Sequence, residues 1–184
     1  MLRQSTDLVL DELARSLRLI DQGQFSAFLE ELLRARRVLC VGVGRVLISL
    51  RAWVKRMAHL EIDIDYVGSE TERPIGPGDL LIVASSSGES AVPVAVAHIA
   101  KKTGARIAYV GCTPESAAAG LSDIRLLLAG RTRYARADEF RSAQPMSTLF
   151  EQQLYLLCDI LTLEIMEKRG WSEEDIRRRH ANLE

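Results

Sequence analysis

Residues 80–90 read LLIVASSSGES, and this stretch decides the fold. Its first five residues are continuously apolar, as in a strand that is buried on both faces of a sheet. A helix is predicted over residues 90–103, because Pro93 falls in the first turn, where proline is tolerated, and Gly104 suits the position that ends a helix. A buried strand, a polar loop and a helix are the repeating unit of parallel α/β folds.

The same unit recurs on both sides of this stretch. Further short apolar runs, each typical of a buried strand, lie at residues 38–41, 64–67, 107–110 and 124–128. Helical stretches separate most of them, at residues 46–60 and after Thr113-Pro114, where Thr113 suits the N-cap and Pro114 the first helical position. The pattern therefore predicts a three-layer αβα sandwich with a five-stranded parallel sheet in a single domain.

The flanking segments complete one domain over residues 1–184. Amphipathic helices are predicted at 7–20 and 26–35, within an N-terminal helical segment (1–36) that precedes the parallel core (37–130). The arginine-rich segment 129–141 predicts a surface loop, and C-terminal helices follow in 142–184, beginning with a long one at 146–169. The broad apolar surface of that long helix is compatible with packing against a neighbouring subunit or with burial inside the monomer.

Composition excludes several classes of protein. The 184 residues carry 24 Lys+Arg and 25 Asp+Glu, whereas proteins that mainly bind nucleic acid usually show a basic excess. No apolar run reaches the roughly 18 residues of a membrane span, and the first residues lack a signal-peptide core, so we expect a cytoplasmic protein that binds no membrane. Three widely spaced cysteines argue against a disulfide framework and against a metal site.

The serine-rich loop 85–90 follows the decisive strand, and ligands of parallel sheets bind at the carboxyl ends of strands. Hydroxyl groups, backbone N–H groups and a helix N-terminus together form a neutral cradle for a phosphate. The hydroxyls come from Ser85, Ser86, Ser87 and Ser90. Because the loop lacks the lysine of a P-loop, it favours a sugar phosphate over a nucleoside triphosphate. Alternatively, Ser87 or Ser90 only caps the helix.

A second loop, residues 42–45 (GVGR), follows the first predicted strand. Gly44 lets the backbone approach a ligand, and the next helix N-terminus favours an anion. Leu47 stands where a dinucleotide fingerprint needs its third glycine, which argues against a nucleotide cofactor. The alternative is a tight turn without a ligand. Arg45 can pair with a phosphate, a sugar hydroxyl or a carboxylate.

Both loops resemble the signature loops of the sugar isomerase (SIS) domain. Three further segments resemble the 6-phospho-3-hexuloisomerase family, and the likeness extends over essentially the whole chain; they are residues 56–60 (RMAHL), 142–152 (SAQPMSTLFEQ) and 179–184 (RHANLE). The resemblance implies an enzyme that interconverts 3-hexulose 6-phosphate and fructose 6-phosphate in the ribulose monophosphate route of formaldehyde fixation. It also implies a homotetramer with shared active sites and no cofactor.

The resemblance assigns three catalytic or binding side chains. It places Glu151 at the family's catalytic base, although Thr148 and Glu151 also have the spacing of a capping box. It makes His59 an acid/base or hydroxyl-orienting group at a subunit boundary, whereas a lone histidine in a helix is otherwise a packing residue. It implies that the tail carrying His180 folds over an active site, although His180 could simply end a solvated basic helix.

One departure from the family pattern concerns the substrate. The family usually has serine at the position of Val46, so a hydroxyl that is expected to face the sugar is replaced by an isopropyl group. This difference leaves open another phosphosugar isomerase of the same fold, or a non-catalytic sugar-phosphate-binding SIS protein. Regulators of that second kind carry a DNA-binding domain, whereas only 37 residues precede the first strand here, without a basic recognition face.

Overall fold

The computed structural model describes residues 1–183; Glu184, the last residue of the segment 179–184, lies outside the described residues. The strands are β1 (Val38–Val41), β2 (Ile64–Tyr66), β3 (Leu80–Ala84), β4 (Arg106–Gly111) and β5 (Ile124–Leu127). The helices are α1 (Leu2–Leu17), α2 (Gln22–Arg34), α3 (Arg45–His59), α4 (Ala91–Thr103), α5 (Ala117–Leu121), α6 (Thr148–Arg169) and α7 (Glu173–Arg177). All five predicted strands are confirmed.

The five strands form one parallel sheet in the order β2-β1-β3-β4-β5. The chain leaves β1 toward β2 and then returns to the other side of β1 with β3, so the direction of winding reverses between β1 and β3. Such a switch point is where open α/β sheets bind ligands. Because Val41 pairs with Val83, the loops 42–45 and 85–90 begin on neighbouring strands, about 5 Å apart.

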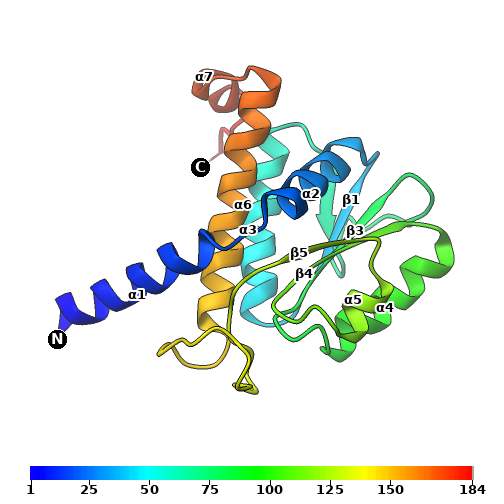
Figure 1. The fold of residues 1–184 in the computed structure, drawn as a ribbon. Coiled ribbons are helices and arrows are strands. Elements are labelled where there is room, and N and C mark those ends of the chain that lie inside the picture. The colour runs from blue at the N-terminus through cyan, green and yellow to red at the C-terminus, as the bar shows by residue number, and fades with distance from the viewer. Residues whose placement is uncertain (184) are drawn as a thin grey trace.

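Helices cover both faces of the sheet, which confirms the three-layer sandwich (Figure 1). Alternate residues of the central strands point to opposite faces: Cys40 and Ile82 pack with α2, α3 and α6, while Val41 and Val83 pack with α4 and α5. Helices α3 and α6 lie side by side and run in the same direction, because Ser49 contacts Glu151 near their beginnings and Leu60 contacts Arg169 at their ends.

Helix α1 extends away from the rest of the molecule, and Figure 1 shows the N-terminus at its free end. Its first seven residues are all exposed, whereas Glu12 and Ser16 in its second half are buried. In the described part of the chain, no helix is long and apolar enough to cross a membrane.

The predicted start of α5 is wrong. The helix begins at Ala117 behind the N-cap Ser116, whose hydroxyl oxygen accepts a hydrogen bond from the backbone N–H of Ala119 at 3.3 Å. Thr113 instead donates its hydroxyl to the carbonyl of Ser86 at 3.4 Å, and the Glu89 carboxylate accepts from the N–H of Ala117 at 2.9 Å. Contacts with the serine loop thus outweigh the local preference of Thr113-Pro114.

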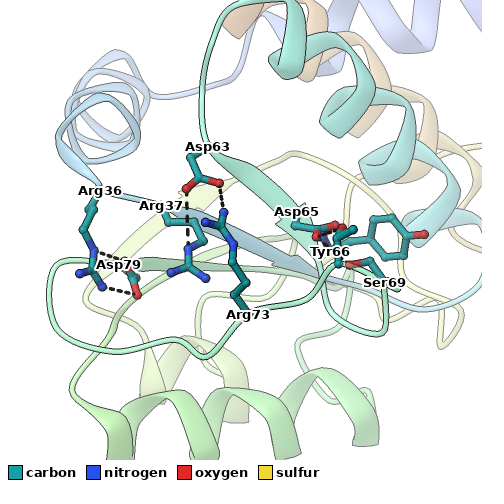
Figure 2. Close-up of polar contacts among 9 residues, drawn as sticks. Arg36, Arg37, Asp63, Asp65, Tyr66, Ser69, Arg73 and Asp79 are labelled. Carbon is teal, nitrogen blue, oxygen red and sulfur yellow. Dashed lines mark hydrogen bonds and ion pairs between the residues drawn. The ribbon is translucent and has the colours of Figure 1, made fainter.

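A charged cluster lies at the amino ends of the strands, at the edge opposite the two loops (Figure 2). Arg36 donates two hydrogen bonds to the buried carboxylate of Asp79, at 2.9 and 3.0 Å, and the N–H of Gly76 donates a third at 3.0 Å. Arg37 and Arg73 both pair with the half-exposed Asp63. The hydrogen bonds to Asp79 hold the turn at residues 76–79, directly before β3, against Arg36, and so set the position at which β3 begins.

Candidate active site

The serine loop is closed by its own hydroxyl groups. Ser85 and Ser90 share a hydrogen bond of 3.1 Å, and the N–H of Gly88 donates to the hydroxyl oxygen of Ser85, also at 3.1 Å. The hydroxyl oxygen of Ser87 accepts from the N–H of Glu89 at 3.3 Å, while the carbonyl of Ser86 accepts from Cys112 at 2.9 Å. The loop is therefore a preformed turn in which Ser85 and Ser87 are buried.

Ser90 is the N-cap residue of α4, but its side chain makes no capping hydrogen bond. The alternative in which Ser90 only caps the helix by its hydroxyl is therefore wrong. Ser87 likewise bonds to Glu89 in the turn rather than to the first turn of α4. Gly88 has φ +68°, and a Cβ there would lie 2.0 Å from the Ser116 hydroxyl oxygen, so only glycine fits this close approach.

The loop at residues 42–45 leads into α3, whose first residue is Arg45. Gly44 is the N-cap residue with φ +57°, a left-handed conformation that glycine adopts without strain. The structure places the Val46 side chain in the core, under Gly42, rather than toward a ligand. Val46 is therefore a core residue, and its isopropyl group does not line the cavity beside Glu151.

Glu151 lies in the first turns of α6, facing α3. Its side chain is 12% exposed, it forms an ion pair with Arg45, and one carboxylate oxygen accepts from the Ser147 hydroxyl at 3.0 Å. Ser49 of α3 donates to the main-chain carbonyl of Glu151 at 3.3 Å. Two side chains thus hold the carboxylate, and a third ties its backbone to the neighbouring helix.

The capping-box alternative for Glu151 is wrong. Helix α6 has Ser147, not Thr148, as its N-cap residue, so Glu151 lies one position beyond the third helical residue that a capping box requires. Its own N–H is bonded to the carbonyl of Ser147 at 3.0 Å, and its carboxylate turns outward to Arg45.

The Glu151 carboxylate opens onto a cavity of about 290 Å³, which is lined by Arg45, Ile48, Ser49, Glu151, Gln152 and Tyr155. Ile48 and Tyr155 are 66% and 48% exposed, respectively. The cavity is therefore lined by the buried Ser49 and the nearly buried Glu151 together with the exposed apolar groups of Ile48 and Tyr155.

The two predicted histidines meet at the other end of the same helix pair. The His59 ring is buried at the end of α3, and the His180 ring lies 4.9 Å from it, centroid to centroid. Arg179 holds the tail in place, because its guanidinium lies 4.2 Å from the Trp171 ring and pairs with Glu61. The tail that carries His180 thus folds over His59.

Within a single copy of the chain, the histidines do not reach Glu151. Arg45 and His59 are 14 positions apart along α3, which corresponds to about 21 Å of helix. The structure therefore brings Glu151 together with Arg45, and His59 together with His180, but places these pairs at opposite ends of α3 and α6.

The three cysteines are buried or partly buried and form no disulfide. Burial raises the pKa of the thiols of Cys40, Cys112 and Cys158, which favours their neutral form over the nucleophilic thiolate. Among residues 1–183, no three His, Cys, Asp or Glu side chains gather closely enough to hold a metal ion.

Comparison with known proteins identifies the family of the chain. Residues 40–111, which contain both loops, match the model of the SIS domain. The chain is 30% identical to the 3-hexulose-6-phosphate isomerase of Bacillus subtilis, covering 96% of this chain and 95% of the relative. The chain belongs to the 3-hexulose-6-phosphate isomerase family.

Two further proteins are similar to almost the whole chain. The 3-hexulose-6-phosphate isomerase of Mycobacterium gastri is 33% identical, covering 96% of this chain and 88% of the relative. A crystal structure from Methanococcus jannaschii, from which a function as 3-hexulose-6-phosphate isomerase was inferred, is 25% identical with a TM-score of 0.83, covering 98% and 99%. The family and the fold together support a sugar-phosphate isomerase.

Sequence reasoning missed two serines that support Glu151. Ser49 follows Arg45 by four residues on the same face of α3, and Ser147 precedes Glu151 by four residues. The four-residue spacing is visible in the sequence, but serine is common on helix surfaces and at N-caps, so spacing alone does not distinguish these two residues.

Proposed function

We propose that the protein is a cytoplasmic 6-phospho-3-hexuloisomerase, which interconverts 3-hexulose 6-phosphate and fructose 6-phosphate without a cofactor. The observation that carries the proposal is the Glu151 carboxylate, which is held by Ser147 and Arg45 at the edge of a cavity instead of closing a capping box. The names of the relatives from Bacillus subtilis and Mycobacterium gastri support the choice of substrate.

The reaction needs one proton to move between two neighbouring carbons. Glu151 removes the proton from C2 of the 3-ketose, the electron pair forms a C2–C3 double bond, and the oxygen on C3 becomes an oxyanion. A proton passes from the C2 hydroxyl to the C3 oxygen, which gives the second form of the cis-enediolate. When the C2 carbonyl forms, Glu151 returns the proton to C3, so a base and hydrogen-bond donors suffice.

The phosphate of the substrate binds the serine loop at the N-terminus of α4 in this proposal. The hydroxyls of Ser85, Ser86, Ser87 and Ser90 would contribute, together with backbone N–H groups. Because the Ser87 oxygen accepts from Glu89, its hydroxyl proton remains available for donation to an anion. Gly44 has no side chain and therefore lets the sugar approach the protein backbone. Arg45 orients Glu151 and binds the hydroxyl groups of the sugar.

The histidines enter the site from a second copy of the chain. Since His59 and His180 lie about 21 Å from the Glu151 end of α3 in one protomer, a site that uses both ends needs two protomers. The exposed Ile48 and Tyr155 at the cavity rim provide apolar surface for that contact. We therefore propose a homo-oligomer, a tetramer, in which His59 acts as acid or orients a hydroxyl and His180 binds the substrate.

A coupled assay tests the proposed reaction. The purified protein is supplied with 3-hexulose 6-phosphate, and fructose 6-phosphate is followed through phosphoglucose isomerase and glucose-6-phosphate dehydrogenase. We expect turnover that is absent without the protein. If the coupling enzymes respond to added fructose 6-phosphate and the protein yields none, the proposed substrate is wrong, and other ketose phosphates are then assayed.

A further inference from the structure

The segment that leads into Glu151 is fastened to the projecting helix α1 by a buried carboxylate. Glu12 is 7% exposed and accepts three hydrogen bonds from residues 142–144. The donors are the Ser142 hydroxyl at 2.6 Å, the Ala143 backbone N–H at 2.7 Å and the Gln144 side-chain amide at 3.0 Å. We call Glu12 and residues 142–144 the α1 clamp.

The hydrogen bonds of the clamp favour an ionised Glu12. Burial alone raises the pKa of this carboxyl group, but the hydrogen bonds from Ser142, Ala143 and Gln144 outweigh burial, and the pKa lies below its usual range. Glu12 is therefore charged at neutral pH, and each of its hydrogen bonds is charge-assisted and stronger than a neutral one.

Three further contacts support residues 140–144. The guanidinium of Arg15, on the next turn of α1, lies 5.5 Å from the centre of the Phe140 ring. Arg131 donates to the carbonyl of Ser142 at 3.2 Å, and the hydroxyl of Ser142 also accepts from the N–H of Gln144 at 3.1 Å. Hydrogen bonds thus hold the segment both to Glu12 of α1 and to Arg131 of the arginine-rich loop.

Between the clamp and Glu151 lies a strained residue. Met146 has φ +56°, which a residue with a side chain adopts only at a cost, and it is 60% exposed. Such a conformation persists when its surroundings impose it. The residue that follows, Ser147, is the N-cap residue of α6 and donates its hydroxyl to the Glu151 carboxylate at 3.0 Å.

We propose that Glu12 is a positioning residue for Glu151, acting through residues 142–147. Glu12 does not touch the carboxylate. It fixes the segment 142–144, which imposes the turn at Met146 and thereby sets the direction of the Ser147 hydroxyl and the start of α6. The proposal rests on the proposed role of Glu151 as base, and it makes α1 part of the catalytic apparatus.

The variant Glu12→Gln tests the proposal, because it keeps the side chain's shape and removes its charge. We expect kcat to fall by roughly 10-fold to 100-fold, since a small misplacement of a catalytic group has effects of this size. KM should stay within about twofold, because the serine loop lies on other elements. Asp7→Asn is the matched control: it makes the same charge change on the exposed first half of α1, away from residues 140–144, and should leave kcat unchanged.

Amide hydrogen exchange gives a readout that does not depend on turnover. In Glu12→Gln, we expect faster exchange at Ala143 and Gln144, and also at Glu151, whose N–H is bonded to the Ser147 carbonyl. If the wild-type protein turns over no 3-hexulose 6-phosphate, the proposed function fails, yet faster exchange at Glu151 still supports the positioning role. Unchanged exchange at Glu151 overturns it.

Ser142→Ala removes one bond of the clamp without a change of charge, so it serves if Glu12→Gln does not fold. It should lower kcat in the same direction by a smaller factor, with an unchanged melting temperature to within a few degrees. A loosened segment with wild-type kcat, in either variant, would overturn the proposal, because catalysis would then be independent of the clamp.

Discussion

Glutamine at position 151 keeps the shape of the side chain and removes its charge, so Glu151→Gln separates catalysis from stability. Ser147 can still donate to the amide oxygen, and the lost partner, Arg45, has a side chain that is 64% exposed. We expect the free energy of unfolding to change by less than about 1 kcal/mol. Turnover should fall by roughly 10²-fold to 10⁴-fold, the usual contribution of a positioned proton-transfer group.

Glu167→Gln is the control for this variant, because Glu167 is an exposed residue of the same helix. Melting temperature and kcat are measured together for both proteins. A Glu151→Gln enzyme that keeps more than about a tenth of its activity would show that another group is the base.

Ser87 is the second residue at which we expect a single substitution to change function. Its oxygen accepts a hydrogen bond inside the serine loop, and its proton is available for the phosphate. For Ser87→Ala we expect KM to rise by roughly 10-fold, the equivalent of one hydrogen bond to a charged group. Ser122→Ala, which removes a hydroxyl bonded to the carbonyl of Ala119 on α5, is the control and should leave KM unchanged. An unchanged KM for Ser87→Ala would argue against the cradle.

Local patterns predicted most elements because their determinants are local. The apolar runs at 38–41 and 80–84 became β1 and β3 with those bounds, and Gly104 ends α4 as its position after the helical stretch predicts. Thr113-Pro114 failed as a helix start because its polar groups bond to Ser86, 27 residues away in the sequence. A contact between residues as far apart in the sequence as Glu12 and Ser142 produces no periodic pattern of residue types, so the sequence could not predict it.

At the scale of an element, the entry of β3 into the sheet depends on Asp79. Hydrogen bonds from Arg36, the largest effect, lower the pKa of this carboxyl group despite its burial, and the Gly76 N–H lowers it further. A lowered pKa in the folded protein means that ionised Asp79 stabilises the fold above its unfolded pKa of about 3.9. That contribution is lost as the pH falls through the lower, folded pKa.

We therefore expect Asp79→Asn to destabilise the protein by about 1–3 kcal/mol at pH 7, because buried hydrogen bonds of a charged group are lost. The difference from wild type should shrink as the pH falls below about 4. Asp63→Asn, at the half-exposed acid of the same cluster (Figure 2), should cost less than about 1 kcal/mol. Urea unfolding of the three proteins at pH 7 and pH 3 measures this, and a pH-independent difference would contradict it.

At the scale of the molecule, a single copy of the chain holds Glu151 and the two histidines at opposite ends of α3 and α6. Sequence resemblance supplied Glu151, His59 and His180 as candidates, but no sequence pattern says that α3 separates them by about 21 Å. Distances between residues on parallel helices follow from packing, which a one-dimensional pattern does not contain. The arrangement agrees with a site shared between two copies of the chain.

Subunit complementation tests that arrangement directly. Glu151→Gln and His59→Gln are each expected to be nearly inactive alone, and sedimentation should show each as a tetramer. If one site takes Glu151 from one protomer and His59 from another, co-expression of the two variants in equal amounts restores both groups in about a quarter of the sites. If each protomer supplied both groups to its own site, every site would lack one of them, and the mixture would stay inactive. Activity near a quarter of wild type in the mixed tetramers, absent when the separately purified variants are combined without subunit exchange, is the expected result.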